Sequence, residues 1–339
     1  MKKEYLLGLD VGGTKIECAL IKITNQQSKD SLNVSTSKYG NQFAAIIDRQ
    51  RIPTNRQAGY ASVMQNISTL CKDILGKAQV QMDQVSGVGM GMPGAIHPIK
   101  QIMQNGNTGI FINQNIALDL QQLLKADVPV YLENDANLFA LSEVLCGAGQ
   151  AFSHSTGKTP YLQTAIGIIL GTGVGGGIVI NEKILQGTNG GGGEIGHTVL
   201  YYDGHPCYCG QNGCAEQYLS GPSLEAQFAT RIYNDIDKRP SSREIFELYH
   251  KKEPQAMASV IQYKKHLVRF LTNLTNIFDP DYFVLGGGVS TQNVIYENLT
   301  EELASKIFIK SSKPQVLKNV LGDSSGVIGA AILPLIVKD

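Results

Sequence analysis

Short apolar stretches separated by glycines predict β-strands at the start of the chain. Residues 4–11 and 15–23 are apolar stretches of strand length, with Gly12-Gly13-Thr14 between them. This pattern indicates a β-hairpin with glycines at its tip. Residues 25–50 are polar and without a clear period, so they are expected to form an exposed hairpin extension or a loop.

After residue 60, the pattern of apolar residues changes to one typical of a helix. Apolar residues recur three and four positions apart between Val63 and Leu75, and residues 85–92 return to a strand pattern. A further strand is predicted over 128–132, and residues 133–137 then open a helix with an apolar face. Strands that alternate with helices are typical of α/β domains.

The second half repeats this arrangement. Strands are predicted over 161–170 and 177–183, joined by the glycine-rich residues 171–176. The later elements are helices near 222–233, 241–252 and 255–278, a strand at 282–285 that runs into three glycines, and a last helix over about 325–337. Two strand-glycine-strand units suggest two related domains, which agrees with a length of 339 residues at about 150 residues per domain.

Composition excludes several classes of function. Lys and Arg together number 29, as do Asp and Glu, so the neutral chain offers no basic surface for nucleic acid unless a local basic patch is present. The charge-free stretch 159–181 contains six glycines, which favours a hairpin over a membrane helix. The N-terminus lacks the apolar segment of a signal peptide, and a cytoplasmic location is expected.

Three glycine-rich loops are candidates for binding phosphate or nucleotide. Residues 10–15 (Asp-Val-Gly-Gly-Thr-Lys) place a carboxylate at a strand end before two glycines, and Asp10 is a candidate Mg²⁺ ligand. Residues 171–177 contain five glycines, and residues 286–288 are three glycines after a strand. Each loop taken alone is also consistent with a simple structural turn.

Cysteines fall into two groups. Cys18, Cys71 and Cys146 are scattered among apolar residues and are expected to be small core residues. The other three are close in sequence and, with an upstream histidine, can close a tetrahedral zinc site without an open position, which makes the zinc structural; the predicted ligands are His197, Cys207, Cys209 and Cys214. His205 is a competing ligand, and disulfides are not expected in a cytosolic protein.

Asp135 follows a predicted strand and opens a helix, where ligands of α/β folds bind. An ionised aspartate there can act as a general base. The alternative from the residues alone is that Asp135 only caps its helix.

Five motifs in order resemble the ROK family of sugar kinases and repressors: residues 10–15, 133–137 (Glu-Asn-Asp-Ala-Asn), 170–177, 193–197 (Gly-Glu-Ile-Gly-His) and 207–216. The resemblance covers nearly the whole chain. It implies an actin-like ATPase (ribonuclease H-like) fold with two α/β domains and a central cleft. The implied domains are a smaller one over 1–135 plus 324–339 and a larger one over 136–323 that carries the zinc loop.

The resemblance also implies roles for individual residues. Asp135 would be the catalytic base, and Asp10 would hold Mg²⁺. Zinc would hold its loop so that nearby side chains face the sugar. The implied sugar-binding residues are Asn107, Asn134, Glu194, His197 and Glu216. The implied ATP-binding residues are Asp10, Gly12, Gly13, Thr14, Lys15, Gly171, Thr172, Gly173, Gly175, Gly287 and Gly288.

The activity expected from the resemblance is ATP-dependent phosphorylation of a hexose at its 6-hydroxyl. Residues 105–107 and 321–331 are similar to those of fructokinases and mannokinases, so fructose, glucose or mannose is favoured over N-acetylglucosamine or N-acetylmannosamine. Residues 170–177 are equally typical of N-acetylglucosamine kinases. The alternative of another class is a sugar-responsive regulator without catalysis, although only nine residues precede Asp10, too few for a helix-turn-helix. The expected partners are the hexose, ATP and a second copy of the chain, with neither nucleic acid nor a membrane.

Overall fold

The computed structural model describes residues 3–106, 108–233, 235, 237 and 239–337. A six-stranded sheet has the order β3-β4-β2-β1-β5-β8, in which β5 and β8 run parallel to β1 and the other neighbours are antiparallel. Its strands are β1 (Tyr5–Val11), β2 (Lys15–Thr24), β3 (Leu32–Thr36), β4 (Gly40–Pro53), β5 (Val85–Met92) and β8 (Val130–Asn134). The predicted glycine-tipped hairpin is therefore confirmed.

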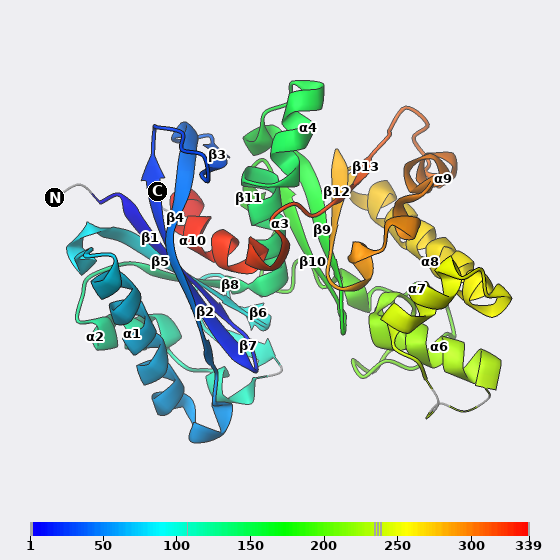
Figure 1. Ribbon diagram of the computed structural model, residues 1–339, viewed down its shortest axis with the longest axis horizontal. Coiled ribbons are helices and arrows are strands. Elements are labelled where there is room, and N and C mark those ends of the chain that lie inside the picture. The colour runs from blue at the N-terminus through cyan, green and yellow to red at the C-terminus, as the bar shows by residue number, and fades with distance from the viewer. Residues whose placement is uncertain (1–2, 107, 234, 236, 238, 338–339) are drawn as a thin grey trace. The chain divides into compact units, whose positions relative to one another are not determined.

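Helices cover both faces of this sheet (Figure 1). The helices α1 (Tyr60–Lys77) and α2 (Ile116–Leu124) lie on one face, and α3 (Asp135–Leu145) and α10 (Ser325–Val337) lie on the other. The α10 backbone comes very close to the strands, because a Cβ at Gly8 would lie 2.3 Å from the Val327 carbonyl oxygen and one at Gly89 would lie 1.9 Å from that of Ala330. Glycines on this face thus let α10 pack directly on the sheet.

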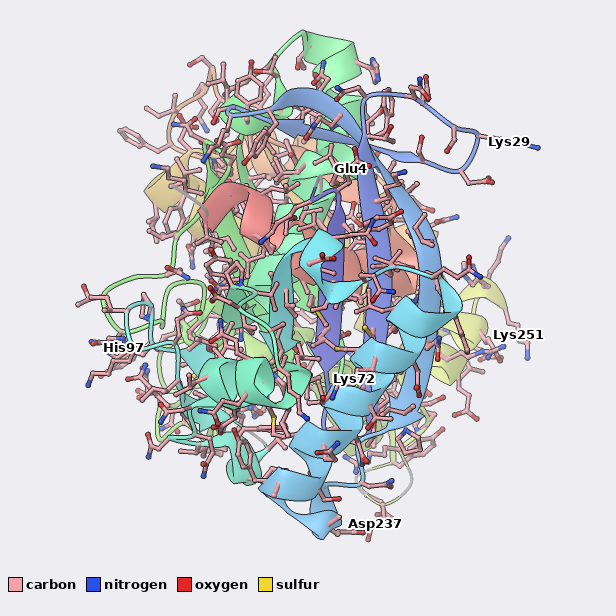
Figure 2. The ribbon with its side chains drawn as sticks, turned by 90° about the vertical axis from the view of Figure 1, so that its left-hand side faces the viewer. Glu4, Lys29, Lys72, His97, Asp237 and Lys251 are labelled. Atoms are coloured by element: carbon pink, nitrogen blue, oxygen red, sulfur yellow. The ribbon has the colours of Figure 1, made fainter. Side chains whose placement is uncertain are left out.

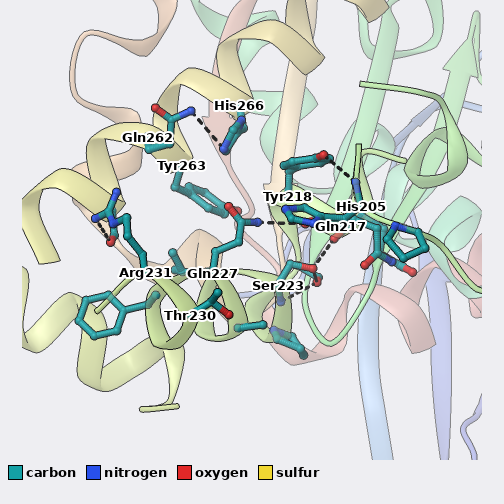
Figure 3. Close-up of a pocket in the computed structure, with 18 of the residues that line it drawn as sticks. His205, Gln217, Tyr218, Ser223, Gln227, Thr230, Arg231, Gln262, Tyr263 and His266 are labelled. Atoms are coloured by element: carbon teal, nitrogen blue, oxygen red, sulfur yellow. Dashed lines mark hydrogen bonds between the residues drawn. The ribbon is translucent and has the colours of Figure 1, made fainter. Parts of the chain in front are cut away.

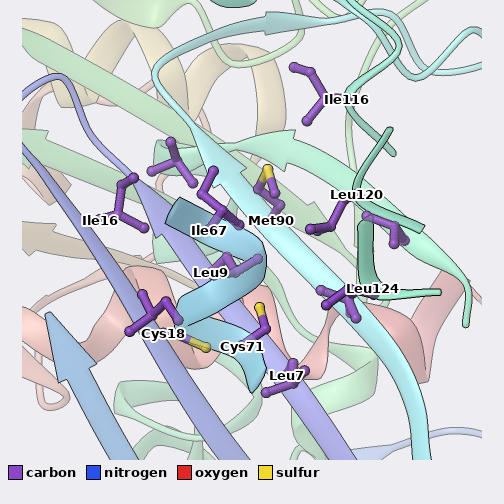
Figure 4. Close-up of a cluster of buried hydrophobic side chains, with 14 of the residues drawn as sticks. Leu7, Leu9, Ile16, Cys18, Ile67, Cys71, Met90, Ile116, Leu120 and Leu124 are labelled. Carbon is purple, nitrogen blue, oxygen red and sulfur yellow. The ribbon is translucent and has the colours of Figure 1, made fainter. Parts of the chain in front are cut away.

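The opposite face forms the hydrophobic core of this region (Figure 4). Leu7 and Leu9 of β1 pack with Ile67 of α1 and Leu120 of α2. Cys18 and Cys71 lie in the same cluster, and a hydrogen bond with Cys71 together with burial raises the pKa of the Cys18 thiol well above its ordinary value. The expectation that Cys18, Cys71 and Cys146 are core residues is confirmed, since all three are buried.

The polar segment 25–50 forms a hairpin, the first of the two predicted alternatives. Strand β4 pairs with β2 from Lys15↔Pro53 to Thr24↔Phe43 and with β3 on its other side. Figure 2 shows Lys29 at the end of the connection that leads from β2 to β3. Ala44 is buried, whereas Ile46 and Ile47 are exposed, so β4 lacks the regular alternation by which a strand is recognised in sequence.

A second sheet has the order β11-β10-β9-β12-β13. Its strands are β9 (Thr164–Leu170), β10 (Val174–Ile180), β11 (Lys183–Ile184), β12 (Tyr282–Gly286) and β13 (Gln315–Lys318). The helices that follow β11 are α5 (Glu216–Leu219), α6 (Gly221–Tyr233), α7 (Ser242–His250), α8 (Pro254–Phe278) and α9 (Leu299–Lys306). The predicted hairpin around residues 171–176 is confirmed. None of the described helices is both long and apolar enough to span a membrane.

Several short elements were not predicted. They are α2, α9, β13, the helix α4 (Ala148–Thr156) and the two-stranded hairpin of β6 (Gly94–Ile96) and β7 (Met103–Gly106). Each has fewer than ten residues, too few for an apolar period to stand out.

Contacts divide the chain into two compact units. The first contains residues 1–163, 177–193 and 320–339, and the second contains residues 164–176 and 194–319. This division places residues 136–163 with the N-terminal segment, whereas the sequence-based boundary follows residue 135. The boundary after residue 135 stays a prediction.

Candidate active site

The glycine turn between β1 and β2 is held by the chain that follows β4. The Gly12 N–H donates to the Lys15 carbonyl at 2.9 Å, and the Thr54 N–H donates to the Thr14 carbonyl at 3.0 Å. The buried Thr54 also donates its hydroxyl to the Gly12 carbonyl at 2.7 Å. Thr14 and Lys15 are exposed at the tip, so a firmly anchored turn presents a hydroxyl, an ammonium group and backbone N–H groups to solvent.

Asp10 lies two residues before this turn. Burial raises the pKa of Asp10, and the nearby cations Lys15, Arg51 and Arg49 oppose that rise. A Cβ at Gly326, near the start of α10, would lie 3.1 Å from the Asp10 Oδ2 atom, so the glycine keeps space beside the carboxylate. A single carboxylate next to a turn that is predicted to bind phosphate fits Mg²⁺, which takes one or two carboxylates together with substrate phosphates and water.

The predicted base Asp135 is the first residue of α3, but it is not the helix cap. Asn134 is the cap: its side-chain oxygen accepts from the N–H groups of Ala136 at 2.9 Å and Asn137 at 3.2 Å. The Asn134 amide also donates to the Gly94 carbonyl at 3.1 Å. The Asp135 Oδ1 atom accepts from the adjacent Ala136 N–H at 2.9 Å. Asn134, predicted to bind sugar, therefore already has a structural role.

Glu133 was not singled out from the sequence, although it is part of the same motif. It is buried and accepts from the side chains of Asn137, at 2.9 Å, and Gln186. Burial raises its pKa, and these hydrogen bonds together with the Asn134 N–H oppose the rise. Glu133 thereby fixes the strand end from which Asn134 and Asp135 project.

In the second unit, the loop between β9 and β10 is bound to α5 and α6. The Val174 N–H donates to the Glu216 Oε2 atom at 2.9 Å, and the Gly221 N–H donates to the Gly171 carbonyl at 2.9 Å. Glu216, predicted to contact sugar, thus contacts the loop predicted to contact phosphate. The residue predicted to bind sugar and the loop predicted to bind phosphate are therefore in direct contact.

Gly287 follows β12 with φ 83°, a left-handed conformation that favours glycine. A Cβ there would lie 2.5 Å from the Leu170 carbonyl oxygen, so glycine is also required by the close approach of β9. Gly288 is exposed and has open space around it.

The exposed Glu194 lies one turn before His197, whose N–H donates to the Glu194 carbonyl at 3.2 Å.

The predicted zinc ligands are gathered at one point. The ligand atoms of His197, Cys207, Cys209 and Cys214 all lie within 4.8 Å of one another. The Cys207 Sγ to His197 Nδ1 distance and the Cys209 Sγ to Cys214 Sγ distance are both 3.6 Å. Ligands about 2.0–2.3 Å from one tetrahedral ion are separated by roughly 3.5–3.8 Å, so three sulfurs and one nitrogen fit Zn²⁺.

Burial raises the pKa of Cys214 to about 12, and a bound cation would favour its thiolate form. His205 lies outside the ligand cluster and stacks on Tyr218 with ring centroids 5.2 Å apart.

Tyr208, between two of these cysteines, was missed by the sequence reasoning. Its hydroxyl lies 3.1 Å from the His197 Nε2 atom, and the two rings meet edge to face. His197 was predicted both to bind zinc and to bind sugar, and its Nε2 atom, the nitrogen that does not face Cys207, already has a hydroxyl partner. The position of Tyr208 between Cys207 and Cys209 is the only sequence signal that could have drawn attention to this tyrosine.

The second unit also has a pocket of about 940 Å³ (Figure 3). Residues of α6 and α8 line it, and Thr172 and Glu216 reach its wall. His266, one of its lining residues, accepts or donates a hydrogen bond with the Tyr201 hydroxyl at 2.7 Å. Burial, with Arg269 and His205 nearby, lowers the pKa of His266 to about 4.

The predicted site residues thus form two groups. The first unit contains Asp10, the turn 12–15, Asn134 and Asp135, and the second contains Glu194, His197, Glu216 and the loops at 171–175 and 287–288. Asn107 lies outside the described residues.

Comparison with known proteins identifies a family for the chain and several similar proteins. The family model described as the ROK family matches residues 6–336. The chain is similar to the N-acetyl-D-glucosamine kinase of Haemophilus influenzae (strain 86-028NP), with 32% identity over 338 residues, 96% of this chain and 98% of that protein. It is similar to the enzyme of the same name from Yersinia pseudotuberculosis serotype O:1b, with 32% identity over 341 residues, 98% of this chain and 99% of that protein.

Solved structures of ROK sugar kinases are also similar to this chain. The ROK hexokinase from Thermus thermophilus has a TM-score of 0.77 and 27% identity and covers 97% of both chains. A ROK family glucokinase from Streptomyces griseus, solved with glucose and AMPPNP, has a TM-score of 0.69 and 26% identity and covers 97% of this chain and 98% of its own.

Proposed function

Because the chain belongs to the ROK family, we propose that it transfers the γ-phosphoryl group of ATP to the 6-hydroxyl of N-acetyl-D-glucosamine. The match to kinases of that name over nearly the full length of both chains carries this proposal. The ROK membership expected from the sequence is confirmed, as are the actin-like ATPase fold of ROK sugar kinases and the activity of a sugar kinase.

The choice of sugar differs from the order of preference drawn from the sequence. Fructose, glucose and mannose were favoured there on short loops at 105–107 and 321–331, whereas the relatives match along the whole chain. Whole-chain similarity is the broader observation, so we place N-acetylglucosamine first and keep the other hexoses and N-acetylmannosamine as competitors.

Asp135 is proposed as the general base. The oxygen of the 6-hydroxyl attacks the γ-phosphorus, the bond from that phosphorus to the bridging oxygen breaks, ADP leaves, and the Asp135 carboxylate takes the hydroxyl proton. Capping by Asn134 supports this role, because it satisfies the helix end without the Asp135 carboxylate.

The chain's other groups would bind and neutralise charge. The turn 12–15 and the loop 171–175 offer N–H groups to phosphate oxygens, and Asp10 would hold Mg²⁺, which neutralises developing phosphate charge. Zinc on His197 and the three cysteines would fix the loop that carries the sugar contacts. A cytoplasmic location and a homodimer remain predictions.

A coupled assay of ADP release tests the proposal. N-acetylglucosamine, N-acetylmannosamine, glucose, fructose and mannose are compared, and ³¹P NMR identifies the phosphorylated position. We expect the highest kcat/KM with N-acetylglucosamine and a 6-phosphate product. A higher kcat/KM for another sugar would reject this acceptor, and no sugar-stimulated turnover would reject the kinase.

A further inference from the structure

A row of charged residues crosses three neighbouring strands of the first sheet. Asp10 on β1 pairs with Glu17 on β2, and Glu17 pairs with Arg51 on β4. Residues directly opposite each other on paired strands project from the same face. Asp10, Glu17 and Arg51 therefore share one face, and Gly326, near the start of α10, lies against Asp10 on it.

Glu17 is the centre of this row. Its carboxylate is only 1% exposed and accepts from the Nε atoms of both Arg49 and Arg51, the latter at 2.6 Å. One negative charge thus lies between two guanidinium groups, and the trio retains a net positive charge. Lys15 adds a further positive charge nearby. The acidic groups that offset this positive charge are Asp10 and Asp323.

The two arginines differ in what else they bind. Arg49 also donates from Nη1 to the Ser324 hydroxyl and from Nη2 to the Asp323 carbonyl at 3.5 Å, so its guanidinium is committed to the segment before α10. Arg51 donates only its Nε within the described part of the chain, and its side chain is 42% exposed. Its two Nη groups remain available to an external acceptor.

The position of Arg51 relates it to the glycine turn. Thr54, three residues later, binds the Gly12 and Thr14 carbonyls. Strand residues advance about 3.3 Å each, so the Cα atom of Arg51 lies about 10 Å from that of Thr54 along β4. An arginine fork with Nε fixed and both Nη free matches two oxygens of a phosphate group.

We propose that Arg51 binds a phosphate group of the nucleotide beside the turn 12–15, and that Glu17 is its positioning residue. This inference rests on the proposed function, because it takes ATP as the ligand. Arg49 then has a structural role, in which it ties β4 to the start of α10.

Calorimetric titration with MgATP tests the proposal in the full chain. For Arg51→Gln we expect a Kd about 10- to 100-fold higher than the parent, the loss typical of one charged hydrogen-bonded contact. Arg51→Lys keeps the charge without the fork and should fall between the two. The affinity for N-acetylglucosamine should stay near the parent value, and any fall in the melting temperature from the lost Glu17 contact should be no larger than that of Arg49→Gln.

Arg49→Gln is the matched control. It should lower the melting temperature, because the contacts of Arg49 with Glu17, Ser324 and Asp323 are lost. It should leave the MgATP Kd within about threefold of the parent, because no phosphate contact is lost. Equal weakening by Arg49→Gln and Arg51→Gln, or an Arg51→Gln Kd within twofold of the parent, would overturn the assignment.

A parent that binds MgATP while Arg51→Gln binds equally well removes this inference alone. A parent that neither binds ATP nor phosphorylates any sugar removes the proposed function and this inference with it.

Discussion

At the scale of single residues, Asp135 separates a catalytic role from a structural one. Because Asn134 supplies the capping oxygen of α3, Asp135→Asn should leave the helix intact while removing the proposed base. We expect kcat to fall by roughly 10²- to 10⁴-fold, as for loss of a positioned general base. Sugar affinity, measured by calorimetry, should change little.

Asp127→Asn is the control for this substitution, since Asp127 is exposed and lies before β8. It should behave as the parent. Retention of kcat within a few-fold by Asp135→Asn would rule out the base.

His266 gives a prediction about pH. Burial lowers its pKa to about 4 in the folded protein, against about 6.5 for an unperturbed histidine. As pH falls from about 6.5 to about 4, the unfolded chain binds a proton that the folded chain does not, so this contribution to stability is present at neutral pH and is lost on acidification. The melting temperature should therefore drop between about pH 7 and about pH 5, and His266→Gln should drop less. Equal drops for both proteins would contradict the assignment.

At the scale of elements, Glu143 links the end of α3 to the start of α10. This buried carboxylate accepts from the N–H groups of Ala148 at 3.0 Å and Leu321 at 2.9 Å and from the Ser325 hydroxyl at 3.1 Å. Glu143→Gln would place an amide N–H against these donors. Leaving buried donors unsatisfied costs about 1–3 kcal/mol, so urea unfolding should show a loss of that size.

The control for Glu143 is Glu247→Gln. Glu247 pairs with Arg243 on α7, and the two side chains are 53% and 84% exposed, so its loss should change stability by less than about 0.5 kcal/mol. If both variants unfolded at the same urea concentration as the parent, the buried link would have no energetic importance.

At the scale of the whole molecule, zinc is predicted to be part of the folded state. Elemental analysis should find about one zinc per chain, and chelation should lower the melting temperature, because binding to a site absent from the unfolded chain stabilises folding. Cys209→Ser should reduce both zinc content and stability; Cys209 is exposed, so the substitution disturbs little else. Cys146→Ser, outside the cluster, should keep its zinc. Full zinc content in Cys209→Ser would reject this ligand set.

Local sequence was enough to predict much of this protein. Apolar period and glycine position identify β1, β2, α1 and α8, because each depends on neighbours a few residues away. The zinc ligands could also be predicted, since three of the four lie within eight residues, 207–214. The short motifs likewise indicated the family, because they are contiguous in the chain.

Tertiary structure decided what depends on residues far apart in sequence. The strand β4 is recognisable only through its pairing with β2, and that pairing alone brings Arg51 beside Glu17 and Asp10. The carboxylate of Glu143 meets N–H groups at 320–321 because α10 returns to the first sheet. Capping by Asn134 rather than Asp135 depends on the backbone angles at the strand end. Register, packing and cap geometry arise from the balance of contacts across the folded unit, and no local pattern encodes that balance.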